Sequence, residues 1–154
     1  MDMPLTEAET SAAPIRIGEA CERGVRFTRE DIAAFARLTG DTTPLNHGPQ
    51  AARRRDGVAS AQQTTAQMMG LAASHFSQGG DGQARELLCL NFNFAFKAPV
   101  FAGQELLLRW SVASVEWNAA LEGWLAHVDG IATVRDGQAC VIGRGTLLVK
   151  PASG

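Results

Sequence analysis

One short segment of the sequence holds the residue types best suited to proton transfer. Residues 38–52 read LTGDTTPLNHGPQAA, and they contain a carboxylate, Asp41, followed by Asn46 and His47. A carboxylate and an imidazole that contact the same water molecule can take a proton from it near neutral pH, because imidazole titrates in that range. The segment therefore raises the hypothesis that Asp41 and His47 form an acid–base pair.

The order of these residues leaves two arrangements open. Asn46 can bind a water molecule or a carbonyl oxygen but cannot exchange protons at physiological pH. Neighbouring residues of an extended segment point to opposite sides, so His47 would need a local bulge to face Asp41, and Gly48 permits such a distortion. Either His47 reaches Asp41, or Asn46 does and His47 lies at the surface. In both arrangements burial would have to raise the pKa of Asp41, because an exposed carboxylate is a weak base.

A run of three arginines follows this segment. Arg53, Arg54 and Arg55 could hold the phosphate groups of a ligand or face an acidic partner protein, since guanidinium groups bind phosphates and carboxylates through paired hydrogen bonds. The alternative is that they form the solvated end of a short helix.

The cysteines and histidines do not suggest a metal site. Cys21, Cys89 and Cys140 lie far apart and form no C-x-x-C unit, and the three histidines are equally scattered. Such spacing is typical of reduced, structural thiols rather than metal ligands. We expect neither a bound metal nor another cofactor.

The composition favours a single ordinary globular domain. The chain has 154 residues, of which 45% are hydrophobic and 19% charged, and its formal net charge is −2. This charge argues against nucleic-acid binding, and no apolar run approaches the roughly 20 residues of a membrane span. The acidic N-terminus, MDMPLTEAETSAAP, lacks the pattern of a signal peptide. We expect a flexible tail over residues 1–14, one domain over residues 15–154, and a cytoplasmic location.

Asp41 is expected to lie just beyond the end of a helix. The stretch FTREDIAAFARLTGD, residues 27–41, has Thr28 at an N-cap position and Asp31 three residues later, as a capping box requires. Apolar residues recur at helical spacing, and Gly40 is suited to the left-handed conformation that ends many helices. The pattern predicts a helix of about three turns that positions Asp41.

A second helix is expected over residues 58–76. The sequence VASAQQTTAQMMGLAASHF is almost uncharged and rich in small residues, so other elements could approach it closely on most sides. We expect a long, central, largely buried helix. The hydroxyls of Thr64 and Thr65 are expected to bond back to the helix backbone. A glycine-rich loop, SQGGDGQA, follows.

The rest of the chain indicates an antiparallel sheet. Residues 86–96, 105–117, 122–134 and 139–150 alternate apolar and polar side chains, and an Asp-Gly pair marks the last turn. A further short strand is expected within residues 14–28. Helices that precede a set of antiparallel strands predict an α+β fold, with the long helix wrapped by a curved sheet.

The order of these elements resembles the hotdog fold, and specifically the MaoC-like, R-specific enoyl-CoA hydratase family, over about residues 18–150. FKAPVFAGQEL, residues 96–106, is similar to the family pattern F-x-x-P-V-x-x-G-D-x-L. GDTTPLN, residues 40–46, is similar to the family's Gly-Asp-x-Asn-Pro-Leu-His, with Thr43 in place of Asn and Asn46 in place of His. The family's His-Gly pair at the helix start corresponds to Ala59-Ser60-Ala61 and is not kept.

The resemblance implies a hydratase or dehydratase that interconverts 3-hydroxyacyl and enoyl thioesters of coenzyme A or acyl carrier protein. Asp41 would be the catalytic carboxylate, assisted by His47 or Asn46. The thioester oxygen would lie at the helix start, beside Ser60, Ala61 and Gln62, and Arg53 and Arg54 would contact the phosphates of the carrier.

The altered motif leaves other functions open. The protein could be a non-catalytic subunit that binds an acyl thioester for a partner dehydratase. It could also be a thioesterase in which Asp41 activates water for attack on the carbonyl. The resemblance further implies a homodimer.

Overall fold

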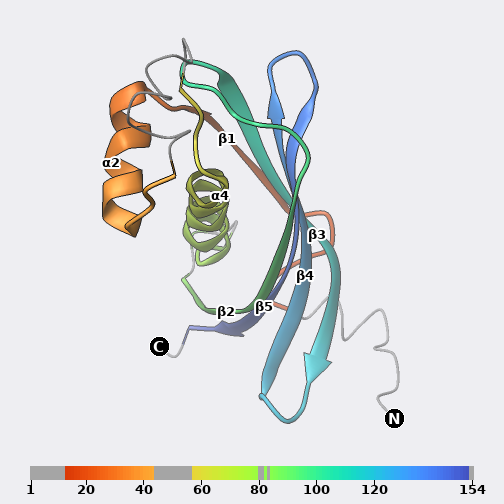
Figure 1. Cartoon of the computed structure of the whole chain (residues 1–154). Helices are drawn as coiled ribbons and strands as arrows, with labels where there is room; N and C mark the ends of the chain where they lie inside the picture. The colour runs from red at the N-terminus through yellow and green to blue at the C-terminus, as the bar shows by residue number, and fades with distance from the viewer. Residues whose placement is uncertain (1–12, 44–56, 80–81, 83, 153–154) are drawn as a thin grey trace.

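The computed structural model describes residues 13–43, 57–79, 82 and 84–152, and these form two long helices and a five-stranded sheet. Figure 1 shows the sheet curving around helix α4, with helix α2 on the side of α4 away from the sheet. The α+β arrangement predicted from the sequence is therefore confirmed. The elements are β1 (Ala20–Arg26), α2 (Arg29–Thr39), α4 (Ala61–Phe76), β2 (Arg85–Phe96), β3 (Glu105–Asn118), β4 (Gly123–Val134) and β5 (Ala139–Pro151).

The five strands are antiparallel and lie in the order β1-β3-β4-β5-β2. Strands β3, β4 and β5 are joined by short hairpins, while β1 and β2 occupy the two edges. In the β4–β5 hairpin the N–H of Gly137 donates to the oxygen of Val134 at 2.8 Å, with φ of Gly137 at 88°. The Asp-Gly turn predicted from the sequence is thus confirmed.

Helix α2 begins and ends as its sequence predicts. Thr28 and Asp31 form the full capping box, with distances of 3.0 Å from the Asp31 N–H to the Thr28 Oγ1 and 2.9 Å from the Thr28 N–H to an Asp31 carboxylate oxygen. Gly40 ends the helix with φ at 71°, a left-handed conformation in which a side chain would be strained. The helix buries Ile32 and Ala36 and leaves Leu38 81% exposed.

Helix α4 is less buried than the sequence analysis expected. Met68, Leu71 and Phe76 face the sheet and are at most 4% exposed, but Ala66 and Gly70 on the opposite side are exposed. The sheet covers only one face of the helix, and the small residues of the other face leave little apolar surface that would need cover. The helix also begins at residue 61 rather than 58, because the preceding residues pair with another loop.

Trp110 fills the space between α4 and the middle of the sheet. Its side chain is fully buried, and its Nε1–H donates to the backbone oxygen of Met68 on α4 at 2.7 Å. A Cβ added to Gly130, its cross-strand neighbour, would lie 2.5 Å from the ring, and one added to Gly143 would lie 3.1 Å from it. Glycines on the inner face thus make room for the indole.

Strand β2 departs from regular alternation at one point. Phe92 and Phe94 turn inward and contact Trp110, with ring centroids at 5.5 and 6.2 Å. The register against β5 shifts between Cys89 and Asn91, so Leu90 occupies a bulge and is 43% exposed. Phe96, which the alternation also placed inside, is 54% exposed at the strand end.

At the N-terminal side the core already includes Ala13 and Ile15, which are 8% and 0% exposed. Residues 1–12 lie outside the described part of the chain, so the predicted tail and its boundary stay predictions.

Within the described residues, neither helix has the length and apolarity needed to cross a membrane.

Candidate active site

A cavity of about 340 Å³ lies at the start of α4, where the segment before the helix meets the loop after β2. Its walls are mostly apolar, and its polar side chains come from the first turns of α4 and from Lys97. The lining residues are Ala59, Ser60, Ala61, Thr64, Phe96, Lys97, Ala98, Pro99, Val100 and Val141.

Backbone pairing between distant segments builds this cavity. Val58 forms an isolated antiparallel bridge with Phe101, and the N–H of Ala59 donates to the oxygen of Val100 at 2.8 Å. This pairing fixes the start of α4 against the turn that the sequence analysis singled out for its Pro-Val-x-x-Gly pattern. The helix N-terminus therefore points into a space enclosed by residues almost forty positions apart.

Ser60 stands at the N-cap of α4 but does not cap it. Serine at this position normally accepts a hydrogen bond from a first-turn N–H, yet the Ser60 side chain makes none. The residue is only 8% exposed, and its Oγ has no hydrogen-bond partner among the described residues. Ser60 thus lies beside the first-turn N–H groups of α4 at one end of the cavity.

Thr64 behaves in the same way one turn further along. It is 2% exposed, and its Oγ1 has no partner within the described part of the chain. The prediction that Thr64 bonds back to the helix backbone was wrong. For Thr65 it is confirmed, since its Oγ1 donates to the oxygen of Gln62 at 3.0 Å.

The N-terminus of α4 is electrostatically suited to an oxygen atom that gains negative charge. The first-turn N–H groups of any helix lack intrahelical partners and carry its positive dipole end. No acidic residue lies in the first turn of α4 to offset that dipole. Of the three substrate-binding residues predicted here, Ser60 and Ala61 line the cavity, while Gln62 is exposed and does not.

Asp41 lies where the sequence placed it, immediately after the left-handed Gly40. Its N–H donates to the oxygen of Ala36 at 2.9 Å, which closes the end of α2, and its Oδ1 accepts from the N–H of Thr43 at 2.9 Å. The residue is half-buried. It is not among the described residues that line either cavity beside α4.

The other predicted site residues lie outside the described part of the chain. These are the two candidates for assisting Asp41 and the two arginines, namely Asn46, His47, Arg53 and Arg54. Their roles, and the choice between Asn46 and His47, stay predictions.

A second cavity, of about 370 Å³, lies between α2 and α4. Phe35 and Leu38 line it from α2, and Gln63 and Gln67 line it from α4. Gln63 is 5% exposed, and its Oε1 has no partner among the described residues.

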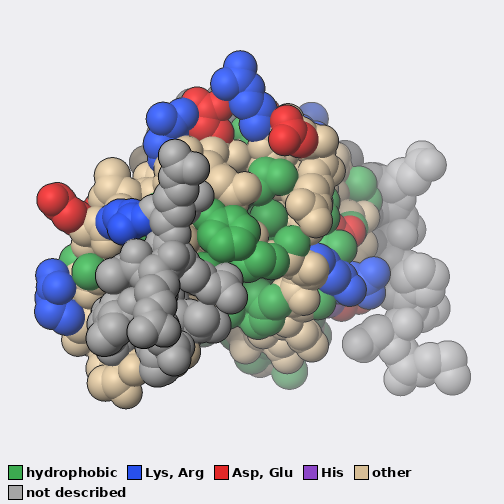
Figure 2. Space-filling model, turned by 45° about the horizontal axis from the view of Figure 1, so that its top comes forward, with side chains coloured by type: hydrophobic (Ala, Val, Ile, Leu, Met, Phe, Trp, Pro, Cys, Tyr) green, Lys and Arg blue, Asp and Glu red, His purple; other side chains and the backbone are tan. Residues whose placement is uncertain are grey.

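Figure 2 shows hydrophobic side chains gathered near the centre of one face of the molecule, with acidic and basic side chains along its upper rim.

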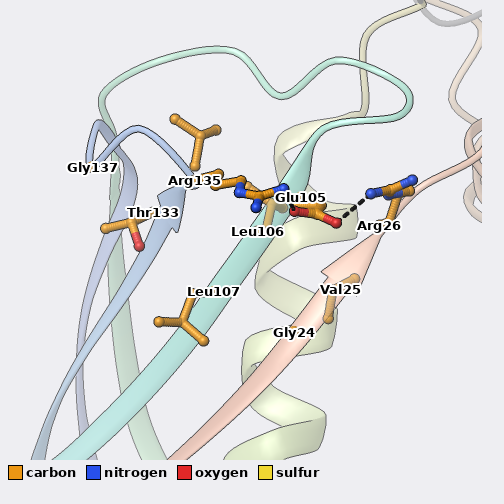
Figure 3. Close-up of a pocket in the computed structure, with 10 residues that line it drawn as sticks. Gly24, Val25, Arg26, Glu105, Leu106, Leu107, Thr133, Arg135 and Gly137 are labelled. Carbon is orange, nitrogen blue, oxygen red and sulfur yellow. Dashed lines mark hydrogen bonds and ion pairs between the residues drawn. The ribbon is translucent and has the colours of Figure 1, made fainter.

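A cavity of about 550 Å³ on the outer side of the sheet does not involve the predicted site residues. It lies between β1, β3 and the β4–β5 hairpin, and Figure 3 shows Glu105 at its edge between Arg26 and Arg135. Glu105 pairs with both guanidinium groups. Because none of the residues predicted to act on a substrate lines this cavity, its position does not support a role in the proton chemistry.

The thiols are held in their neutral form. Burial raises the pKa of Cys21, Cys89 and Cys140, and the three cysteines form no disulfide. A thiol with a raised pKa is a poor nucleophile, because the thiolate is the reactive species. Among the described residues, no three His, Cys, Asp or Glu side chains lie close enough to hold a metal ion.

Solved structures with the same fold carry hydratase and dehydratase names. An (R)-hydratase from A. caviae involved in PHA biosynthesis matches with a TM-score of 0.72 and 21% identity, over 86% of this chain and 96% of that chain. The R-hydratase PhaJ1 from Pseudomonas aeruginosa matches with a TM-score of 0.73 and 18% identity, over 94% and 85%. The HadBC 3R-hydroxyacyl-ACP dehydratase complex from Mycobacterium tuberculosis matches with a TM-score of 0.68 and 21% identity, over 87% and 96%.

These likenesses confirm the hotdog fold that the resemblance implied. The model of the family "FAS1-like, dehydratase domain region" matches residues 17–142, well over half of the chain. The chain belongs to this family. Family membership makes the protein a hydratase or dehydratase, that is, a carbon–oxygen lyase. No curated protein matches the sequence.

In this chain of the dehydratase family, the sequence analysis did not identify every polar residue that lines the cavity at the start of α4. Ser60 and Thr64 are four residues apart, a spacing that places two hydroxyls on one helix face. This spacing can be read from the sequence. However, Ser and Thr side chains within a helix also commonly bond to the helix backbone, so the spacing alone does not identify a site. Only the tertiary structure shows that both residues line a cavity.

Proposed function

We propose that this protein hydrates or dehydrates an acyl thioester at the start of α4, interconverting 3-hydroxyacyl and enoyl forms carried by coenzyme A or acyl carrier protein. The observation that carries the proposal is an apolar cavity closed by an uncapped helix N-terminus, with Ser60 and Ala61 at its end. An acyl chain suits the apolar walls, and a thioester oxygen suits the N–H groups.

The helix start supplies the electrostatic part of the mechanism. The negative charge that develops on the thioester oxygen during removal of the α-proton is stabilised by N–H groups at Ala61 and Gln62. Because these donors are fixed before the reaction, they need no reorganisation as the charge forms. Loss of one such donor typically lowers kcat by a factor of about 100 to 1000.

Asp41 supplies the proton-transfer part. Its carboxylate orients water or takes its proton, assisted by His47 or Asn46. Support comes from its sequence position and its half-buried state at the end of α2. Its Oδ1 accepts the N–H of Thr43, which holds the carboxylate at the end of α2. Arg53 and Arg54 contact the phosphates of the carrier, and the exposed Lys97 at the cavity adds a further positive charge.

The direct test is an assay with crotonyl-CoA and, in reverse, with 3-hydroxybutyryl-CoA. We expect loss of the enoyl absorbance with the first and its appearance with the second. Longer acyl chains and carrier-bound substrates extend the test. If no thioester gives any change, the catalytic proposal is wrong. Release of thiol from acyl-CoA without hydration would instead identify a thioesterase.

The comparisons do not favour the non-catalytic partner subunit that the sequence analysis left open. The reasons for considering it are the replacement of the expected histidine by Asn46 and the hydrogen bond of an Asp41 carboxylate oxygen to its own loop. Two structural neighbours, the HadBC and ChsH1–ChsH2 structures, are described as complexes of two different chains. This candidate predicts that acyl thioesters bind without turnover.

The edge strand β2 supports a homodimer. Among the described strands it pairs only with β5, and its exposed side chains include Leu88, Leu90 and Phe96. An unpaired strand edge with apolar side chains is a template for pairing with another chain. We infer that two copies join along β2, and that the assembly has twice the 16.4 kDa mass of the chain.

A further inference from the structure

The cavity of about 550 Å³ on the outer side of the sheet, called the outer cavity below, lies over a row of cross-strand neighbours. Gly24 on β1 pairs with Leu107 on β3, and Leu107 pairs with Thr133 on β4. All three line the outer cavity, and none of its lining residues belongs to the site at the start of α4. Its volume is within the range of about 300–1,000 Å³ that is typical of small-molecule sites.

Gly24 is required neither by the backbone conformation nor by packing within the described residues. Its φ is not positive, and an added Cβ would meet no atom closer than the oxygen of Leu106 at 4.0 Å. Gly130 differs, because its Cβ would lie 2.5 Å from Trp110. A glycine inside a strand weakens the strand, and it often marks a place where a ligand approaches the backbone. At Gly24 the missing side chain leaves the outer cavity open.

The middle of the outer cavity is apolar. Leu107 is 43% exposed although β3 is an interior strand of the sheet, and Gly24 beside it presents only backbone. An exposed leucine in a concave surface favours a ligand with a hydrocarbon part, because binding would remove its apolar surface from water.

One edge of the outer cavity carries a cluster with an excess of positive charge. Figure 3 shows Glu105 between Arg26 and Arg135 in a row above Leu107 and Gly24. One carboxylate oxygen of Glu105 accepts from Arg26, and the other accepts from Arg135 at 3.0 Å. No other charged residue lines the outer cavity, so two guanidinium groups and one carboxylate leave a formal charge of +1.

This cluster suits a ligand with a single negative charge. A guanidinium group has five N–H donors, so Arg26 and Arg135 keep donors for a second anion after pairing with Glu105. Glu105 holds the two groups together, which lowers the conformational cost of binding. On the same face of the sheet Arg109 pairs one-to-one with Glu22 at 2.5 Å, and that pair has no excess charge.

We propose that the outer cavity binds a carboxylic acid with a hydrocarbon chain, with the chain over Gly24 and Leu107 and the carboxylate between Arg26 and Arg135. A carboxylate is favoured over a doubly charged phosphate, because its charge of −1 matches the charge of the cluster and its two oxygens match the guanidinium fork. This site is separate from the proposed catalytic cavity and does not depend on turnover there.

The test is a titration of ¹⁵N-labelled full-length protein with octanoate, followed through the backbone amide signals by NMR. We expect shifts at Gly24, Leu107 and Thr133, and the shifts give the Kd. Octan-1-ol has the same chain without the charge and should bind these residues more weakly. Signals of Ala59 and Ser60 report separately on the cavity at the start of α4.

Three variants test the two parts of the site. Gly24→Val fills the outer cavity and should abolish the octanoate shifts there without lowering the Tm, because valine is favoured in strands. The double variant Arg26→Gln/Arg135→Gln changes the cluster charge from +1 to −1 and should weaken binding about 5- to 25-fold, the worth of two exposed charge pairs. Arg109→Gln is the matched control and should leave the Kd unchanged, since Arg109 does not line the cavity.

Several results would overturn the inference. They are shifts confined to the cavity at α4, equal binding of octan-1-ol and octanoate, or octanoate shifts at the outer cavity that persist in Gly24→Val or in the double variant. Binding of phosphatidylglycerol vesicles without binding of octanoate would assign the surface to a membrane. Protection of the same amides by an increase in protein concentration alone would assign it to a second copy of the chain. Both outcomes contradict the proposed ligand.

Discussion

Asp41 is positioned by backbone contacts on both sides of it. Its own N–H closes the last turn of α2 through Ala36, and its Oδ1 accepts the N–H of Thr43. The side chain of Asn can make the second contact equally well, since its amide oxygen accepts hydrogen bonds. The contact to Thr43 and the chemical role of this carboxylate can therefore be separated by experiment.

We expect Asp41→Asn to abolish most hydration of crotonyl-CoA while the contact to Thr43 is kept. The variant keeps the contact to Thr43 but removes the proton acceptor, and general base catalysis typically contributes a factor of about 100 to 10000 in rate. Asp41→Ala is the control for the loop, because it should lower both kcat and Tm. Full activity of Asp41→Asn would show that the carboxylate is not the base.

The fit of Trp110 depends on a glycine beside it. A Cβ at Gly130 would lie 2.5 Å from the indole, and the ring is fixed by its hydrogen bond to Met68. We expect Gly130→Ala to destabilise the protein by about 1–3 kcal/mol, the usual cost of overpacking a core. Urea unfolding measures this. Gly70→Ala, at an exposed helix position with no atom near its Cβ, should instead stabilise slightly.

At the scale of elements, α2 depends on its capping box. The hydrogen bonds of Thr28 lower the pKa of the Asp31 carboxyl, first through its backbone N–H and then through its side chain. A lowered folded-state pKa means that this carboxylate stabilises the fold above its unfolded pKa of about 3.9 and stops doing so as the pH falls through its folded value.

We therefore expect the Tm difference between the wild type and Asp31→Asn to be constant at neutral pH and to shrink below about pH 4. Thermal unfolding from pH 7 to pH 2.5 measures this difference. Asp136→Asn, in the β4–β5 turn, is a control in a different element. A difference between wild type and Asp31→Asn that grows in acid would contradict the role of the capping box.

Glu19, the residue before β1, is linked to the end of α4 and to the start of β2, because it pairs with Arg85 and lies 3.6 Å from His75. Arg85 at the start of β2 contacts both carboxylate oxygens of Glu19 at 2.9 Å, and its side chain is only 6% exposed. It also donates to the oxygen of Phe76, the last residue of α4, at 3.4 Å. A paired, nearly buried guanidinium thus links the end of α4 and the start of β2 to Glu19, which is 66 positions away in the sequence.

Glu19→Gln should lower the free energy of unfolding by about 1–3 kcal/mol, because it leaves the Arg85 charge buried without its counterion. Chemical denaturation measures the loss. Glu22→Gln is a matched control, since Glu22 pairs with Arg109 at the surface and both side chains are about half exposed. Equal effects of the two substitutions would show that burial of the Arg85 pair does not matter.

At the scale of the whole molecule, the edge of the sheet at β2 is the surface along which we expect two copies to join. Leu88 on that strand is 57% exposed, and Leu107 on the interior strand β3 is 43% exposed. We expect Leu88→Lys to shift the protein from dimer toward monomer in sedimentation experiments, since charge on an edge strand opposes pairing. Leu107→Lys should leave the mass unchanged. A wild type that sediments at 16.4 kDa would contradict the homodimer.

The sequence by itself determined the features that depend on neighbours along the chain. The capping box of α2, the left-handed Gly40, the Asp-Gly hairpin and the strand alternation all follow from contacts within a few residues. These local signals placed Asp41 after a helix, and the family resemblance carried by the GDTTPL and APVFAG segments implied the hotdog fold and the hydratase or dehydratase class.

Only the tertiary structure decided what the residues of α4 contact. The pairing of residues 57–59 with residues 100–102 moved the start of the helix to residue 61 and enclosed a cavity there. The hydroxyls of Ser60 and Thr64 are buried there without partners among the described residues, although their sequence context is that of ordinary helix residues. Such properties arise when segments distant in the sequence meet, so no local pattern records them.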